Sequence, residues 1–207
     1  MMGAWTDPIN ADFPPSRALS GAPEPPLAAC QPGRPSLGSA GSPERPPTRS
    51  TVKLSELLPS AAIRLDVDGH DKWELIGVLT DALIASGQVG QEQREAVHEA
   101  LVQREKSMST GMEKGIAIPH ASVEVVQETA VALGVARQGI DFEAMDGQST
   151  HLVILLVNPA NQTRDHIRNL AEIARLLSSS SLREALQGVA SPEEALECIQ
   201  AAEASVG

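Results

Sequence analysis

Cysteines, clusters of basic residues and long apolar runs are scarce in this sequence, and each shortage excludes a class of protein. The two cysteines, Cys30 and Cys198, provide neither a disulfide framework nor a cysteine-based metal site, which favours a reducing, cytoplasmic setting. The longest strongly apolar run, Leu152 to Val157, is far shorter than the roughly 20 residues that span a bilayer. We therefore expect a soluble, cytoplasmic chain that does not insert into a membrane.

The sequence is strongly acidic. It holds 27 Asp and Glu against 16 Lys and Arg, a formal net charge of -11, and it has no run of basic residues. Binding of nucleic acid or of an anionic membrane surface needs clustered Lys and Arg, so neither partner is expected. A basic surface on a partner protein is compatible with this charge.

Composition divides the chain near residue 50. Residues 1–50 hold eleven of the 15 prolines, and their acids balance their arginines. Such a stretch buries too little apolar surface to offset the entropy lost on ordering, which predicts a disordered tail rich in Pro, Ser and Gly. Within it, Leu27 to Cys30 has the form of a lipoprotein cleavage box, but the residues before it lack the apolar stretch of a signal peptide. Residues 51–203 are long enough for one folded domain.

Periodic apolar patterns in residues 51–203 predict an α/β domain. Two segments are apolar on both alternate sets of positions, as expected of strands that helices cover on both faces. Helices are expected where apolar residues recur every three or four positions behind a capping residue. The expected strands are Ile63 to Val67, Ile116 to Ile118, Ala130 to Ala136 and Leu152 to Val157; the expected helices are Asp71 to Ser86, Gln91 to Glu105 and Arg164 to Ser178, with two more capped by Ser181 and Ser191. This order predicts a mixed β-sheet sandwiched by helices.

Five histidines are the main candidates for chemistry, and none forms a helical metal motif. They are His70 and His98, expected in solvent, His151, expected to cap the edge of a buried strand, and His120 and His166. Gly115 shortly precedes His120, and Pro119 fixes the backbone directly before it. A histidine beyond a strand end, approached through glycine-containing loops, is placed where backbone amides surround an anion. An ordinary surface histidine is an equally good interpretation of this local pattern.

His166 and Arg104 complete a candidate anion site. His166 lies near the start of the helix predicted from Arg164, where the helix dipole attracts negative charge and a ring proton suits a phosphate oxygen. Arg104 continues the apolar stripe of Val97 and Leu101, and a guanidinium on an inward face is costly unless it reaches solvent or meets an anion. A boundary histidine without a function is the alternative for His166.

Two separated motifs resemble those of one family. Arg104 to Gly111, followed by Gly115 to His120, resembles the active-site segment of phosphotransferase-system IIA domains of the fructose, mannitol and nitrogen-regulatory class. Asp165 to Ile167, with the later Leu170 and Ala174 to Leu177, resembles that family's second histidine region. The resemblance extends over about residues 51–203 and keeps the family's order throughout.

The resemblance implies a phosphoryl carrier with the IIA type-2 fold. It implies that His120 accepts a phosphoryl group from phospho-HPr, a small histidine-phosphorylated carrier protein, and that His166 stabilises it. It also implies supporting positions for Arg104 and Thr110, no cofactor and no metal, and onward transfer to a cysteine of a IIB domain or control of a regulatory target protein. A neutral imidazole suits this reaction, since its unperturbed pKa of about 6.5 leaves a lone pair for attack on phosphorus.

The sequence leaves the biological role open. It does not separate a sugar-transport subunit from a nitrogen-regulatory type of protein that signals by its phosphorylation state, although a domain that stands alone favours the regulatory type. The sugar cannot be read from it, because a IIA domain holds no sugar-contacting residues. The alternative to phosphotransfer is a protein-binding regulatory module that keeps the fold without the reaction. A metal-dependent hydrolase is disfavoured, since neighbouring carboxylates and histidines form no cluster.

Overall fold

The computed structural model describes residues 53–65, 67 and 71–206. The predicted tail of residues 1–50, with Cys30, and the predicted solvated position of His70 lie outside these ranges. The helices are α1 (Leu54–Leu57), α2 (Lys72–Ala85), α3 (Arg94–Ser107), α4 (Thr163–Leu177), α5 (Ser180–Gly188) and α6 (Pro192–Val206), with short 3-10 turns at Ser60–Ala62 and Gln91–Gln93. The strands are β1 (Ile63–Arg64), β2 (Gly111–Met112), β3 (Ile116–Ala117), β4 (His120–Val123), β5 (Ala130–Ile140) and β6 (Thr150–Pro159).

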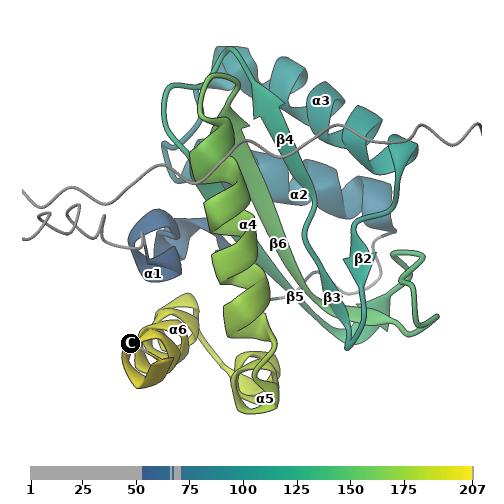
Figure 1. The fold of residues 1–207 in the computed structure, drawn as a ribbon, viewed down its shortest axis with the longest axis vertical. Coiled ribbons are helices and arrows are strands. Elements are labelled where there is room, and N and C mark those ends of the chain that lie inside the picture. Colours follow the sequence, from purple (N-terminus) through teal and green to yellow (C-terminus); the bar gives the residue numbers. More distant parts are fainter. Residues whose placement is uncertain (1–52, 66, 68–70, 207) are drawn as a thin grey trace, which may run out of the picture. The chain divides into compact units, whose positions relative to one another are not determined.

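One mixed sheet organises the domain. Its strand order is β1-β5-β6-β3-β2, and β4 also pairs with β6. The long strands β5 and β6 are antiparallel, whereas β1 is parallel to β5 and both β3 and β4 are parallel to β6. Helices α2 and α3 lie behind this sheet and α4 crosses its front, as Figure 1 shows. The predicted mixed sheet between helices is therefore confirmed.

Strands β3 and β4 form one edge beside β6 that Pro119 interrupts. The sequence predicted a single short strand ending at Pro119, but pairing resumes at once, with His120 opposite Leu156. Proline lacks the N–H that a ladder needs, yet its carbonyl still accepts. The amide of Leu156 donates to the Pro119 carbonyl oxygen at 2.9 Å. Pro119 therefore interrupts the strand without ending it, and His120 opens β4.

Capping residues decide where the helices begin. The Asp71 side chain accepts from the amides of Trp73 and Glu74, and Glu74 reaches back to the Asp71 amide, which confirms the predicted capping box of α2. The predicted cap of α5 is wrong by two residues, because Ser179 and not Ser181 accepts from the Leu182 amide. Several adjacent serines there offer equivalent caps.

The start of α6 follows the prediction in part. Pro192 is its first residue, and the Ser191 hydroxyl accepts from the Glu194 amide. The Glu194 carboxylate reaches the amide of Ala190, one residue earlier than a capping box requires.

None of the helices in the described ranges combines the length and apolar character needed to cross a bilayer.

A bulge in β5 explains the position of His151. β5 extends beyond the predicted end at Ala136, to Ile140. Its pairing with β6 shifts register between Val135 and Ile140. His151 Nδ1 lies 3.0 Å from the Ala136 carbonyl oxygen, which the bulge leaves without a regular ladder partner. The imidazole therefore completes the hydrogen bonding at an irregular point inside the sheet, not at a strand edge as predicted.

Candidate active site

His120 lies at the break between β3 and β4 with its ring held by the backbone. Its Nδ1 is 2.8 Å from the carbonyl oxygen of Ile118. A carbonyl oxygen only accepts, so Nδ1 carries the proton and the neutral ring keeps its lone pair on Nε2. Burial lowers the pKa of His120 below its usual value, against the opposing effect of the Ile118 hydrogen bond. The neutral ring therefore has a defined tautomer, with its lone pair on Nε2.

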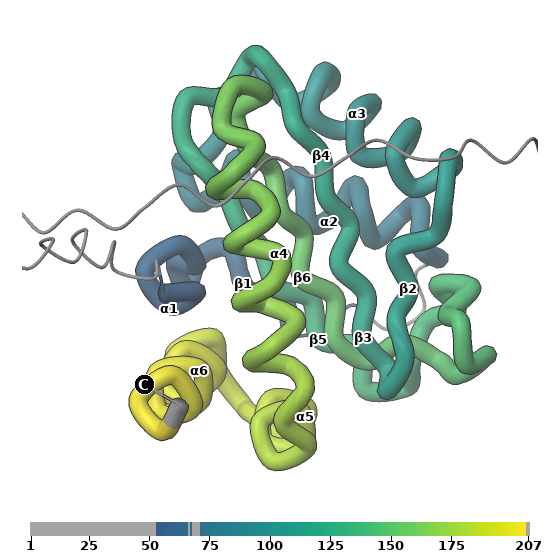
Figure 2. Tube along the Cα trace, viewed as in Figure 1, coloured from purple at the N-terminus to yellow at the C-terminus, as the bar shows by residue number. Residues whose placement is uncertain are grey.

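The structure brings His166 to His120, as the sequence argument required. The two ring centroids are 5.3 Å apart and their planes are tilted by 51°. His166 is in the first part of α4, which crosses the sheet in front of β6 in the tube view of Figure 2. Burial lowers the pKa of His166, and the neighbouring His120 and Arg104 lower it further. Both imidazoles are thus biased toward their neutral forms.

A buried asparagine that sequence reasoning missed holds His166. Asn158 in β6 is fully buried, and its Nδ2 lies 2.7 Å from His166 Nδ1. The hydroxyl of Thr129 donates to Asn158 Oδ1 at 2.9 Å, and Asn169 Nδ2 donates to the same oxygen at 3.4 Å. The sequence signal was a polar amide directly after the apolar run of β6, which the prediction interpreted as the end of the strand.

Arg104 serves the site from α3, though not from the predicted position. The buried stripe of α3 is Val97, Leu101 and Glu105, so Arg104 lies beside the stripe and not on it. Its Nη1 donates to the Met108 carbonyl oxygen at 2.8 Å, at the C-terminal end of the helix. Its positive charge acts on both imidazoles and lowers the pKa of each. A cation held here also suits an anion bound at His120.

Thr110 is joined to the buried carboxylate of Glu105, whose side chain is 0% exposed. The Thr110 hydroxyl donates to Glu105 Oε2 at 2.5 Å, and the Thr110 amide donates to both carboxylate oxygens. Lys72 Nζ lies 3.9 Å from Glu105 and 3.0 Å from Glu143, and it sits over the Trp73 ring. This charged cluster fixes the loop beside His120, and Glu105 and Lys72 were not predicted as part of it.

Two backbone amides of the segment before β3 already have hydrogen-bond partners within the protein. The Thr110 amide is taken by Glu105, and the Gly111 amide donates to the Ser109 hydroxyl at 3.1 Å. Gly111 serves close packing instead, since a Cβ there would stand 2.7 Å from the Phe142 carbonyl oxygen. Besides these amides, His166 lies next to His120, and the charge of Arg104 acts on it.

A cavity of about 410 Å³ opens at His120, and its lining includes Arg104 and Thr110. Leu170, Ala171 and Ala174 of α4 give the cavity an apolar wall. Met112 and Met145 line it and are exposed, and the exposed Met108 directly precedes its lining residue Ser109 in the chain. Met145 is 89% and Met108 69% exposed. Apolar groups left this open beside His120 are typical of a surface for contact with another molecule.

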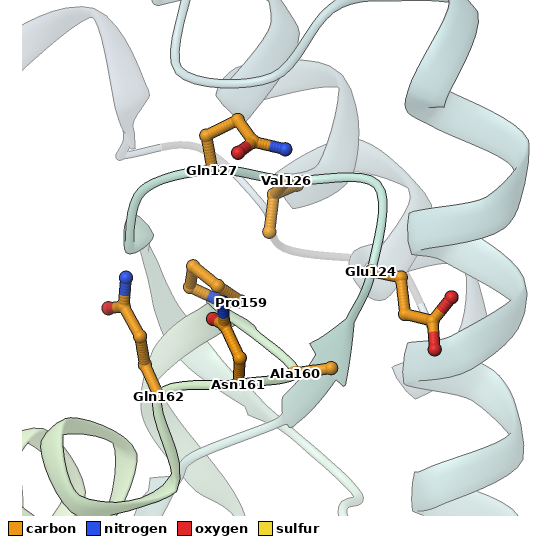
Figure 3. A pocket seen from close by; sticks show the side chains of 7 residues that line it. All are labelled: Glu124, Val126, Gln127, Pro159, Ala160, Asn161 and Gln162. Atoms are coloured by element: carbon orange, nitrogen blue, oxygen red, sulfur yellow. The ribbon is translucent and has the colours of Figure 1, made fainter.

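The remaining candidates stand apart from this centre. His98, predicted to be solvated, is half-buried on α3, and its ring faces Gly77 of α2. Across the described residues, no three His, Cys, Asp or Glu side chains gather in a way that would hold a metal ion. A second cavity, of about 560 Å³, lies beyond the ends of β4 and β6, with Gln127 on the loop above it and Gln162 below it in Figure 3.

Comparison with known proteins identifies the family of residues 56–202. The family model "Phosphoenolpyruvate-dependent sugar phosphotransferase system, EIIA 2" matches residues 56–202. A nitrogen regulatory protein of Bradyrhizobium diazoefficiens is 40% identical over 136 residues, covering 66% of this chain and 87% of that protein. The fructose-specific EIIABC component of Bacillus subtilis is 32% identical over 148 residues, or 72% of this chain, and the match spans only 23% of that longer protein.

Solved structures show the same fold. The nitrogen regulatory protein IIA-Ntr of Neisseria meningitidis matches with a TM-score of 0.64 and 32% identity, over 70% of this chain and 97% of that one. The mannitol IIA of Escherichia coli, in a complex with phosphorylated IIB, matches with a TM-score of 0.59 and 26% identity, over 70% and 99%. The chain therefore belongs to the EIIA type 2 family of the phosphoenolpyruvate-dependent sugar phosphotransferase system.

Proposed function

We propose that this protein is a phosphoryl carrier that accepts a phosphoryl group from phospho-HPr on His120 Nε2 and passes it to a second protein. The observation that carries the proposal is the pairing of His120 with His166 beside Arg104 at an open apolar cavity. The second protein is a IIB domain or a regulatory target. We also propose that the protein acts in the cytoplasm, as the sequence predicts. IIA type 2 domains are phosphotransfer components, and the IIB partner is supported by the mannitol IIA complex.

The chemistry needs only the groups described around His120. The Nε2 lone pair attacks phosphorus, the bond from phosphorus to the donor's histidine breaks, and the donor's imidazole keeps the electron pair. His120 keeps its Nδ1 proton on the Ile118 carbonyl, so the phosphorylated ring is a cation. In the onward step an acceptor nucleophile attacks phosphorus and His120 leaves as neutral imidazole, a good leaving group. No base or cofactor enters this cycle.

Charge stabilisation supports the same assignment. A phosphoryl group in transfer spreads negative charge over its oxygens, so catalysis depends on placement and on nearby positive or hydrogen-donating groups. Arg104 supplies a positive charge that acts on both rings, and His166 supplies a ring nitrogen close to His120. Thr110 lines the cavity, but its hydroxyl proton is engaged with Glu105. Thr110 therefore contributes mainly by shaping the loop.

The exposed apolar rim supports contact with partner proteins. Met112 and Met145 line the cavity that contains His120 and are exposed, and the exposed Met108 precedes its lining residue Ser109. Methionine adapts its shape, which suits a surface that has to receive first a donor and then an acceptor. The exposed rim is consistent with direct docking of both partners at His120.

Phosphorylation in a reconstituted system tests the proposal. The full chain is incubated with phosphoenolpyruvate, enzyme I and HPr, and an acid-labile phosphoryl group is measured. We expect labelling of the unmutated protein, none of His120→Ala, and unchanged labelling of His98→Ala, which controls for loss of a histidine elsewhere. His166→Ala should still accept the group but transfer it slowly. If the unmutated protein stays unlabelled, the protein-binding regulatory module becomes the better assignment.

A further inference from the structure

We propose that Asn158 is a positioning residue that fixes the proton of neutral His166 on Nε2, so that His166 is always a hydrogen-bond donor toward the phosphoryl site. The functional half of this inference rests on the proposed phosphotransfer at His120. The tautomer itself does not, because it is a property of the unphosphorylated protein.

The orientation of the Asn158 amide starts the argument. Its side chain is at 0% exposure inside β6, where no solvent competes for its hydrogen bonds. Two donors converge on its Oδ1, the Thr129 hydroxyl at 2.9 Å and Asn169 Nδ2 at 3.4 Å. An amide oxygen accepts and an amide nitrogen donates, so this pair of donors points the Asn158 Nδ2 group at the remaining neighbour. That neighbour is His166.

The tautomer of His166 follows from this orientation. Asn158 Nδ2 lies 2.7 Å from His166 Nδ1, and a donor at this distance requires a lone pair on Nδ1. A neutral imidazole has one protonated nitrogen, so the proton is on Nε2. The opposite tautomer would set two N–H groups against each other in a buried place, at the cost of an unsatisfied donor. The tautomer of His166 is thus determined by Asn158 in β6 and by Thr129 in the loop before β5.

His120 and His166 carry opposite tautomers for a common purpose. The Ile118 carbonyl places the His120 proton on Nδ1 and frees Nε2 as the nucleophile. The Asn158 amide places the His166 proton on Nε2 and occupies Nδ1. With the rings 5.3 Å apart, one supplies the lone pair and the other donates a hydrogen bond to a phosphoryl oxygen. Neither ring has to change its protonation state for this.

A consequence concerns pH. The groups that act electrostatically on His166 are His120 of β4 and Arg104 of α3, and both lower its pKa, as burial does. A donor that depended on the imidazolium form would be lost above that pKa. With Asn158 in place the neutral ring still donates from Nε2, so transfer by the wild-type protein should not fall as His166 deprotonates.

The wild-type tautomer is the first test. In the uniformly ¹⁵N-labelled full chain, two-bond proton–nitrogen correlation spectra distinguish protonated from unprotonated ring nitrogens, and His166→Gln identifies the His166 signals. Above the titration midpoint we expect the proton of His166 on Nε2. A proton on Nδ1 would overturn the inference, whatever the fate of the phosphotransfer assay.

Asn158→Asp is the second test, because it keeps the shape but turns the donor into an acceptor. The carboxylate draws the proton to His166 Nδ1 and should raise the titration midpoint of His166 by about one unit or more. Above the new midpoint the neutral ring lacks an Nε2 proton, so transfer from phospho-HPr should fall on the order of tenfold. Below it the imidazolium restores the donor and the rate should recover.

Asn161→Asp is the matched control, since Asn161 is exposed in the turn that follows β6 and the substitution adds the same charge. It should leave the tautomer and the pH profile as in wild type. An Asn158→Asp protein that keeps the wild-type pH profile contradicts the positioning role. If Asn158→Asp fails to fold, the His166 tautomer measured in the wild-type protein still tests the positioning role. If the wild-type protein shows no phosphoryl transfer, that result contradicts the proposed function and not the tautomer.

Discussion

Two buried polar clusters support His120 and His166, and they differ in what their loss should cost. The charged cluster consists of Lys72, Glu105 and Thr110. The amide cluster consists of Thr129, Asn158 and Asn169 and ends on His166. A buried charge needs its partners for the fold to hold, whereas neutral amides mainly set a direction. Substitutions in the charged cluster should therefore lower the free energy of unfolding, and substitutions in the amide cluster should mainly lower the rate of phosphoryl transfer.

Removal of the Glu105 carboxylate should have the largest effect on stability. Among the described residues, Glu105→Ala leaves Lys72, which is 6% exposed, with the exposed Glu143 as its one ion-pair partner, and it frees two donors of Thr110. We expect a loss of about 3 kcal/mol in the free energy of unfolding, measured in urea. Glu99→Ala, on the exposed face of the same helix, should change it by less than about 0.5 kcal/mol. Equal effects would remove the distinction between the clusters.

The two threonines allow a direct comparison, because Thr→Val removes one hydroxyl and keeps the shape. Thr110→Val deletes a donor to a buried carboxylate and should cost about 2 kcal/mol. Thr129→Val deletes a donor to a neutral amide oxygen and should cost about 1 kcal/mol, since Asn169 still donates to that oxygen. Urea unfolding of both variants gives the two numbers. A larger cost for Thr129→Val would reverse the assignment of the clusters.

Neither cluster was predicted from the sequence, although other parts of the fold were. The apolar runs of β5 and β6 and the Asp71 capping box were readable, because burial and capping have local signatures. His120 and His166 were found through motifs, although only the fold shows that their rings meet. The predicted roles of His120, His166, Arg104 and Thr110 stay predictions until the transfer assay is done.

What the sequence could not supply are the pairings across the fold. Glu105 looked like the end of a helix, and its contact with Lys72 joins α3 to α2. Asn158 looked like the end of a strand in the sequence. Its contact with His166 depends on hydrogen bonds that join it to Thr129 and to α4. The resumption of pairing after Pro119 depends on β6, which lies far along the chain. Such long-range hydrogen bonds leave no periodic pattern to read.

The smallest effect should appear in the pH dependence of stability, to which the lowered pKa of His120 contributes. Burial lowers the pKa of His120 in the folded protein, while the unfolded chain takes up its proton near the ordinary value of about 6.5. Below that value the unfolded state binds more protons, so the free energy of unfolding should decrease as the pH falls through about 6.5 toward the folded pKa. His120→Gln removes this contribution, so its stability should fall less between about pH 7 and pH 5.5 than that of wild type, in urea titrations at each pH. Parallel curves would show that His120 titrates alike in both states, and that its neutral form at the site owes nothing to burial.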